Sequence, residues 1–335
     1  MKRDSSTPVE LFDAAITGHR HAIGRLLSLV EQGGASADAV SALTHEKSGA
    51  AMVIGITGPP GSGKSSLLSQ LLKEVVAAGF RPAVIAVDPS SPLTGGAILG
   101  DRVRIDATDT ATFIRSIATR GHSGGLALAV PGAVRVLDAV GFNPIIIETV
   151  GVGQVEVDVT ASADTTIVVA NPGTGDAVQA NKAGLLEVAD IFVVNKSDLP
   201  GSDDARRDLE LMLDLSHMTG QEDSTGRRPP IIMANSLEGS GAAELWAAVV
   251  EHGEHLVATN QLSARRAKRQ LAELRSRVSD ALMDALDSEL ASKHGADIVV
   301  ALSDRRITPT EASSQIISRV IRTDERPARP RGPQV

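Results

Sequence analysis

The chain has 335 residues, 42% of them hydrophobic, and a formal net charge of -8 at pH 7. This length suits one large domain or two smaller ones, and the apolar fraction excludes a mainly disordered chain. The acidic balance argues against a nucleic-acid partner, and a sequence without cysteine has no disulfides or thiolate metal sites. Because no apolar run reaches the ~18 residues that span a bilayer, we expect a soluble, cytoplasmic protein without a membrane partner.

The first part of the chain has the periodicity of helices. Apolar residues at helical spacing predict helices within residues 8–47, and Gly33-Gly34 ends the second of them. We interpret residues 1–48 as an N-terminal helical extension packed against the main domain.

The pattern changes to alternating strands and helices over residues 49–258. The expected strands are 52–57, 83–88, 144–149, 165–170, 191–195 and 230–234. The expected helices are 64–79, 109–120, 131–141, 178–188, 203–219 and 241–258. Near-continuous apolar strands are typical of a sheet buried on both faces. The region therefore predicts an α/β domain with a doubly wound, mainly parallel sheet.

The remainder of the chain predicts helix and then disorder. Five apolar residues mark one face of a long charged helix: Leu271, Leu274, Val278, Leu282 and Leu286. We interpret residues 259–322 as a C-terminal helical arm for dimerisation; the alternative is a surface helix folded on its own domain. Residues 323–335 have the composition of a disordered tail.

The most informative stretch lies between the first strand and the helix that follows it. It reads Gly58-Pro59-Pro60-Gly61-Ser62-Gly63-Lys64-Ser65, with Ser66 next. The glycines let backbone N–H groups curl around an anion, and the helix start adds its positive end. Lys64 can reach the β- and γ-phosphates, and the Ser65 hydroxyl can ligate Mg²⁺. The stretch therefore predicts a phosphate-binding loop; a chance glycine-rich turn is the alternative.

Two further strand ends predict recognition of guanine, and so of GTP and GDP. Asn195-Lys196-Ser197-Asp198 closes one strand. The Asp198 carboxylate can accept hydrogen bonds from guanine N1–H and the 2-amino group, neither of which adenine offers. Asn195 can tie this loop to the phosphate loop, and the Lys196 stem can cover the base. In Asn235-Ser236-Leu237, a backbone N–H can meet guanine O6. Many guanine-binding proteins have Ser-Ala where Asn235-Ser236 stands here.

Acidic strand ends predict a magnesium shell and a catalytic set. Glu148 can hold Mg²⁺ directly or through water, the Gly151 N–H can sense the γ-phosphate, and Gln154 can position water. The candidate catalytic residues are Lys64, Glu148, Gly151 and Gln154. The candidate metal ligands are Ser65, Asp88, Asp101 and Glu148, of which Asp101 lies in a long loop after a strand. The alternatives are a surface amide for Gln154 and turn-capping roles for Asp88 and Asp101.

These motifs, in this order, resemble the MeaB/ArgK-type GTPases, the family that includes the human methylmalonic aciduria type A protein. The matching blocks are Gly58–Ser65, Val87–Ser91, Gly96–Asp101, Glu148–Gln154 and Asn195–Asp198. A further block, Pro172-Gly173-Thr174-Gly175-Asp176, is followed by Gln179 and Lys182. The resemblance covers residues 8–290.

The resemblance implies a P-loop NTPase fold, Mg²⁺-dependent hydrolysis of GTP and a homodimer built with the C-terminal helices. It also implies a metallochaperone that assists an adenosylcobalamin-dependent methylmalonyl-CoA mutase, with Asp176, Gln179 and Lys182 in a third switch that relays the nucleotide state. Here Ala177-Val178 and Ala180-Asn181 replace the commoner Glu-Leu and Gly-Ile. The client, methylmalonyl-CoA mutase or a related acyl-CoA mutase, therefore stays open. The rival interpretations are a GTP-dependent kinase, a nickel-type metallochaperone and an ATP-driven partitioning protein.

Overall fold

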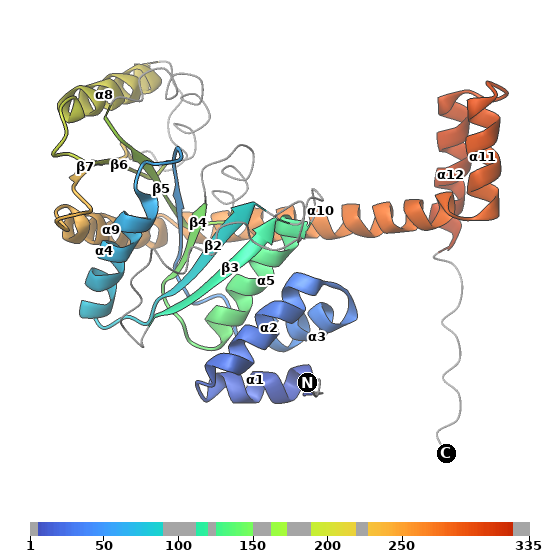
Figure 1. Ribbon diagram of the computed structural model, residues 1–335, viewed down its shortest axis with the longest axis horizontal. Helices are drawn as coiled ribbons and strands as arrows, with labels where there is room; N and C mark the ends of the chain where they lie inside the picture. Colours follow the sequence, from blue (N-terminus) through green and yellow to red (C-terminus); the bar gives the residue numbers. More distant parts are fainter. Residues whose placement is uncertain are drawn as a thin grey trace. The chain divides into compact units, whose positions relative to one another are not determined.

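Two compact units, Met1–Leu271 and Ala272–Val335, make up the chain in the computed structural model (Figure 1). The structure describes residues 6–89, 112–119, 125–149, 162–172, 189–218 and 227–323. In these residues no helix is both long enough and apolar enough to cross a membrane.

The first unit is built on a seven-stranded sheet with the order β3-β2-β4-β1-β5-β6-β7. The strands are β1 (Val53–Thr57), β2 (Ala83–Pro89), β3 (Phe113–Thr119), β4 (Ile145–Thr149), β5 (Thr165–Ala170), β6 (Ile191–Asn195) and β7 (Ile231–Ala234). Neighbouring strands of the sheet all pair in parallel. The predicted parallel α/β architecture is confirmed.

Helices cover both faces of this sheet, which is the doubly wound arrangement. Helices α4 (Lys64–Ala77) and α9 (Ala242–Ala258) pack on one face, whereas α5 (Gly125–Ala139) and α8 (Ser202–Met218) pack on the other (Figure 1). Side chains alternate between the faces along each strand. In β4, Ile145 and Ile147 join the core beside α5, while Ile146 joins the core beside α4. Two buried faces explain why the strands read as continuous apolar runs.

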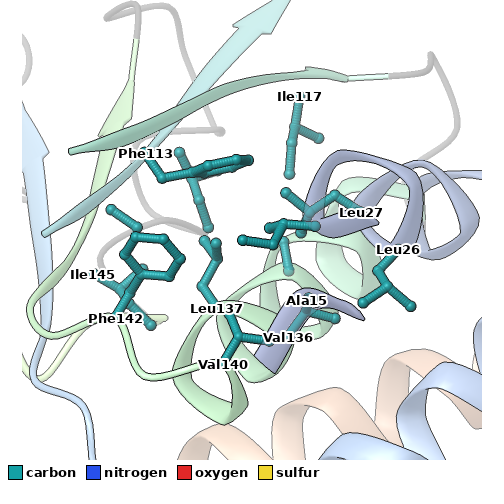
Figure 2. Close-up of a cluster of buried hydrophobic side chains, with 14 of the residues drawn as sticks. Ala15, Leu26, Leu27, Phe113, Ile117, Val136, Leu137, Val140, Phe142 and Ile145 are labelled. Carbon is teal, nitrogen blue, oxygen red and sulfur yellow. The ribbon is translucent and has the colours of Figure 1, made fainter. Parts of the chain in front are cut away.

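The N-terminal helices are part of the main core. They are α1 (Pro8–Ile16), α2 (Arg20–Gln32) and α3 (Gly34–His45), and Gly33 ends α2 as predicted. Figure 2 shows side chains from α1, α2, α5, β3 and β4 meeting in one buried cluster. Leu26 and Leu27 of α2 are fully buried there with Val136 of α5. The predicted packing of this extension against the main domain is confirmed.

The predicted helix 109–120 is wrong, because residues 113–119 form the edge strand β3. Phe113 and Ile117 are buried at strand spacing, but the charged Arg115 falls on the same face and hides the apolar alternation. Its guanidinium is satisfied by Glu31 of α2, at 2.9 Å, and by the Ser28 hydroxyl. A residue distant in sequence thus allows a charge on the covered face of a strand.

One other predicted element differs from the structure. The helix predicted at 131–141 instead begins at Gly125. Proline favours the first turn of a helix, but Pro131 lies inside α5, so it does not mark the start of this helix. The predicted helix 178–188 and the predicted tail beyond Thr323 lie outside the described residues.

The long charged helix predicted from the apolar positions Leu271 to Leu286 is confirmed as α10 (Gln261–Leu290). Helices α11 (Lys293–Ser303) and α12 (Pro309–Thr323) follow it. In the second unit, Ile298 of α11 and Ile316 of α12 form a small buried cluster, with Leu286 of α10 packed against it. The start of α11 is capped, since the Ser292 hydroxyl accepts the Gly295 N–H at 3.1 Å.

Three arginines fix the first turns of α10 to the amino ends of the sheet, within the first unit. Arg265 donates to both carboxylate oxygens of Asp190, at 2.9 and 2.8 Å. Arg266 and Arg269 pair with Asp164 at 3.2 and 2.8 Å. Both aspartates are buried, and a buried carboxylate is tolerated only when it is paired and hydrogen-bonded.

The Asp190 carboxylate stays ionised in this setting. Burial raises its pKa, but the neighbouring side chains of His252 and Arg265 outweigh burial and hold the pKa below its ordinary value. A depressed carboxylate pKa stabilises the fold above the unfolded-state pKa, and this stabilisation is lost as the pH falls through the folded-state pKa. The ion pair between Asp190 and Arg265 is therefore fully formed at neutral pH.

Candidate functional site

The candidate site lies where parallel strands end at one edge of the sheet. The register sets Ile56 of β1 beside Glu148 of β4, and Val87 of β2 beside Thr149. On the other side of β1, Asn195 at the end of β6 lies beside Ala234 of β7. The loops that follow these strands therefore share one edge, as expected for ligand sites in such folds.

The predicted phosphate loop links β1 to α4 and takes a conformation that needs glycine. Gly58 and Gly63 have φ angles of 140° and 87°, a region that residues with a Cβ avoid. A Cβ on Gly58 would lie 2.2 Å from the Val169 carbonyl oxygen of β5, and one on Gly63 would lie 2.3 Å from Asn195 Nδ2. The loop thus packs tightly against two other strand ends and leads directly into the first turn of α4, whose leading N–H groups lack partners within the helix.

Lys64 is buried and folds back over the loop that precedes it. Its Nζ donates to the carbonyl oxygens of Gly58, at 2.7 Å, and Pro59, at 3.1 Å. These contacts hold a positive charge at the start of a helix, where the helix dipole is also positive. Such an arrangement attracts an anion with several charged oxygens.

Ser65 and Glu148 fit the predicted magnesium site. The Ser65 hydroxyl donates to Glu148 Oε1 at 2.7 Å, and the Glu148 side chain is buried. A hydroxyl and a carboxylate are the hard oxygen donors that Mg²⁺ takes when the nucleotide and water complete its shell. Asp88 lies near the end of β2, two strands from the phosphate loop. The described residues contain no cluster of three or more acidic or histidine ligands.

Asn195 joins the phosphate loop to the loop after β7. The fully buried side chain donates from Nδ2 to the Ser62 carbonyl oxygen at 2.8 Å. Its Oδ1 accepts from the Ser236 hydroxyl at 2.8 Å and from the Ser236 N–H at 3.2 Å. The bond to Ser62 is the tie between the Asn195–Asp198 loop and the phosphate loop that the sequence suggested. The bonds to Ser236, which the sequence did not suggest, add the loop after β7.

The neighbours of Asn195 present a lysine stem and a carboxylate. Lys196 has a φ of 58°, and its Nζ donates to the Gly61 carbonyl oxygen at 2.8 Å. This bond lays the side chain against the phosphate loop. The Asp198 side chain is exposed at the same edge of the sheet, so its carboxylate is open to a ligand.

The loop after β7 is ordered by its own polar side chains. Asn235 Oδ1 accepts the Leu237 N–H at 3.1 Å, and the Asn235 N–H donates to the Ser240 carbonyl oxygen at 3.1 Å. The Leu237 side chain is almost fully exposed.

Sequence reasoning missed one contact at this edge. Gln70 of α4 donates from Nε2 to the Ser236 carbonyl oxygen at 3.0 Å. A single glutamine on a helix has no spacing signature, so nothing in the pattern indicated it. The remaining predicted residues, namely Asp101, Gly151, Gln154, Asp176, Gln179 and Lys182, lie outside the described residues.

Comparison with known proteins decides the family. Over residues 23–291 the sequence matches the family described as Methylmalonyl Co-A mutase-associated GTPase MeaB. The chain belongs to the MeaB family. It is therefore a GTPase that binds GTP, and the predicted activity and family resemblance are confirmed.

Individual relatives of this MeaB-family chain cover most of its length. A protein of Pyrococcus abyssi is 43% identical over 314 residues, which span 93% of this chain and 96% of the relative. GTPase ArgK of Escherichia coli is 33% identical over 269 residues, 78% of this chain and 80% of ArgK. The Fused isobutyryl-CoA mutase of Cupriavidus metallidurans is 37% identical over 207 residues, 59% of this chain but only 18% of that protein.

A solved structure shares the fold. The crystal structure described as LAO/AO transport system kinase has a TM-score of 0.69 and 24% sequence identity, covering 96% of this chain and 100% of that chain. At this identity the likeness shows the P-loop NTPase fold alone.

We predict that Gly63→Ala abolishes tight GTP binding. The new Cβ would force apart the phosphate loop and Asn195. Gly79→Ala is the matched control, because Gly79 has the same φ of 87° but its Cβ would meet no atom within 4 Å. For Gly63→Ala we expect the affinity for a fluorescent GTP analogue to fall at least about 100-fold, because a rotamer change of Asn195 alone cannot relieve the new contact. Equal affinities in the two variants would contradict the packing of this loop.

Proposed function

We propose that this MeaB-family GTPase is a nucleotide-dependent switch that assists an adenosylcobalamin-dependent acyl-CoA mutase, with methylmalonyl-CoA mutase as the expected client. Its role would be assembly, cofactor loading and protection of that enzyme. The observation that carries the client is the family description, methylmalonyl-CoA mutase-associated GTPase, over residues 23–291. The fused isobutyryl-CoA mutase supports it, because a segment similar to this chain lies in the same polypeptide as a mutase.

Within this proposal the phosphate loop, residues 58–66, holds the triphosphate. Lys64 exchanges its two carbonyl contacts for β- and γ-phosphate oxygens, to which an ammonium binds more strongly. Ser65 and Glu148 hold Mg²⁺, with Asp88 and Asp101 in the surrounding shell. Bound Mg²⁺ neutralises charge that develops on the phosphate oxygens.

The base is read by the Asn195–Asp198 loop and by the loop after β7, which the Asn195 side chain joins. The exposed Asp198 carboxylate accepts from guanine N1–H and the 2-amino group, Lys196 covers the base, and the Asn235–Leu237 loop supplies a backbone N–H for O6. The buried bonds of Asn195 support this assignment, because they keep the two loops at a fixed separation.

The switch itself rests on contacts that differ between GTP and GDP. The Gly151 N–H and Gln154 would sense the γ-phosphate and position water, and Asp176, Gln179 and Lys182 would relay the state to the mutase. Only a client with different affinities for the two states can be coupled in this way. At equilibrium the coupling is reciprocal, so the mutase must also alter nucleotide binding.

We further propose a homodimer formed through the α10 segment of the second unit. Leu274, Val278 and Leu282 are each more than half exposed, at 56, 51 and 52%, on one face of the helix. We expect Val278→Glu/Leu282→Glu to dissociate the dimer in sedimentation equilibrium, and Ser276→Glu, on the opposite face, to leave it intact. A wild-type chain that sediments as a monomer at micromolar concentration would remove this part of the proposal.

The mutase hypothesis is tested by steady-state GTP hydrolysis. We expect slow hydrolysis by the chain alone, dependence on Mg²⁺, and a change of rate when purified methylmalonyl-CoA mutase is added. Hydrolysis that continues without divalent ions would remove the magnesium assignment. An unchanged rate with this mutase and with isobutyryl-CoA mutase would remove the client. Transfer of radiolabel from GTP to a protein would instead favour the kinase alternative.

Base recognition is tested by Asp198→Asn. We expect GTP affinity to fall by about 10- to 150-fold, since each hydrogen bond to a charged group is worth about 1.5–3 kcal/mol. Affinity for xanthosine triphosphate should rise, because an amide can donate to the xanthine O2 and still accept from N1–H. Asp208→Asn, on the exposed side of α8, is the matched control and should change neither affinity. Equal losses for GTP and ATP would contradict the assignment of Asp198.

A further inference from the structure

Gln70 connects the helix after the phosphate loop to the loop proposed to read the base. Its Nε2 donates to the Ser236 carbonyl oxygen at 3.0 Å, and the contact is partly buried. The N–H and hydroxyl of Ser236 both donate to Asn195 Oδ1, at 3.2 and 2.8 Å. All three polar groups of Ser236 are therefore held, two by β6 and one by α4.

Lys73 determines which end of the Gln70 carboxamide faces the loop. The Lys73 ammonium donates to Gln70 Oε1 at 3.0 Å. An ammonium is a donor only, so it must face the oxygen of the amide. The Nε2 group is consequently turned toward the Ser236 carbonyl, where a donor is needed, and the two contacts support the same amide orientation.

The loop backbone comes close to this carboxamide. Gly239 has a φ of 82°, and a Cβ at this position would lie 3.3 Å from Gln70 Oε1. The Gly239 N–H in turn donates to the Asn235 carbonyl oxygen at 2.9 Å. Gln70 thus fills a closely fitted position under the turn that follows β7.

We propose that Gln70, oriented by Lys73, is a positioning residue for guanine recognition. It holds the Ser236 peptide at the separation from the phosphate loop at which a backbone N–H of the Asn235–Leu237 loop meets guanine O6. Because Lys64 begins the helix that carries Gln70, one rigid element sets the distance between the phosphate and base subsites. This inference rests on the proposed assignment of that loop to the base.

The expected effect is moderate and specific. A partly buried hydrogen bond between neutral groups contributes enough for a change of about 2- to 13-fold in affinity when it is lost. The loss should fall on ligands that carry the O6 acceptor. A nucleotide that binds through its phosphates alone should be unaffected, because the Gln70 carboxamide bonds to Ser236 and Lys73, which both lie outside the phosphate loop.

The test measures dissociation constants of full-length Gln70→Met for GDP, IDP and ADP. Methionine keeps the length of the side chain but has no N–H donor. GDP and IDP both carry O6, whereas ADP does not, so we expect GDP and IDP to weaken together by about 3- to 10-fold and ADP to stay unchanged. Glu74→Met, on the same helix, is the matched control and should leave all three constants unchanged. Thermal unfolding without nucleotide confirms that each variant is folded.

The three ligands separate the possible failures. An equal loss for all three would mean that Gln70 only supports the fold, and unchanged constants would mean that it has no role; either result overturns the inference. If the wild-type chain binds GDP and ADP equally, the proposed guanine site itself is wrong. If the wild type prefers GDP and Gln70→Met keeps that preference, only the role of Gln70 is wrong.

The orientation by Lys73 is tested by a double-mutant cycle. Lys73→Glu should turn the Gln70 amide so that its oxygen faces the Ser236 carbonyl, and GDP should weaken at least as much as in Gln70→Met. The double variant Lys73→Glu/Gln70→Met should be no weaker than Gln70→Met, because the amide on which residue 73 acts is gone. Additive losses would overturn the role assigned to Lys73.

Discussion

The buried carboxamide of Asn195 is the interaction on which the arrangement of the site depends. It donates to the carbonyl oxygen of Ser62 and accepts from the N–H and hydroxyl of Ser236. A buried amide left without partners costs about 1–3 kcal/mol for each group, so neither loop can move away without loss. Because Asn195 ends a strand that is buried throughout, the sheet fixes where this amide lies. Loops that are distant in sequence are thereby joined into one site.

The same strands are anchored at their other ends. Asp190 precedes β6 and Asp164 precedes β5, and both carboxylates are paired with arginines of α10. Val53 at the start of β1 also donates its N–H to Asp164, at 3.0 Å. Breaking one partner of such a pair would leave a buried charge, which costs several kcal/mol. Polar contacts, rather than an apolar face, therefore hold the first turns of α10 in the first unit. No residue of this helix is buried.

The sequence predicted those parts of the molecule whose chemistry needs a fixed local pattern. Gly58 and Gly63 are required by positive φ angles and close approach, and Asn195 follows an apolar strand, so both loops could be found from spacing. Strand β3 could not, because Arg115 needs Glu31 beside it to be tolerated on a covered face. The arginine–aspartate pairs that hold α10 and the bond between Gln70 and Ser236 could not be predicted for the same reason. Asp190 lies 75 residues from Arg265, and Ser236 lies 166 residues from Gln70, and a polar residue on a helix carries no sign of such a partner.

The departure at Asn235-Ser236 from the commoner Ser-Ala has a physical rationale in this structure. Asn235 Oδ1 accepts the Leu237 N–H and so closes the turn. The Ser236 hydroxyl donates to Asn195 at 2.8 Å, a shorter bond than that from the Ser236 N–H at 3.2 Å. If the Ser236 N–H turns to a guanine O6, the hydroxyl still satisfies Asn195 Oδ1, whereas an alanine there would leave that buried oxygen with one donor fewer. The Ser236 hydroxyl would thus keep the two loops joined if the Ser236 N–H exchanged its partner.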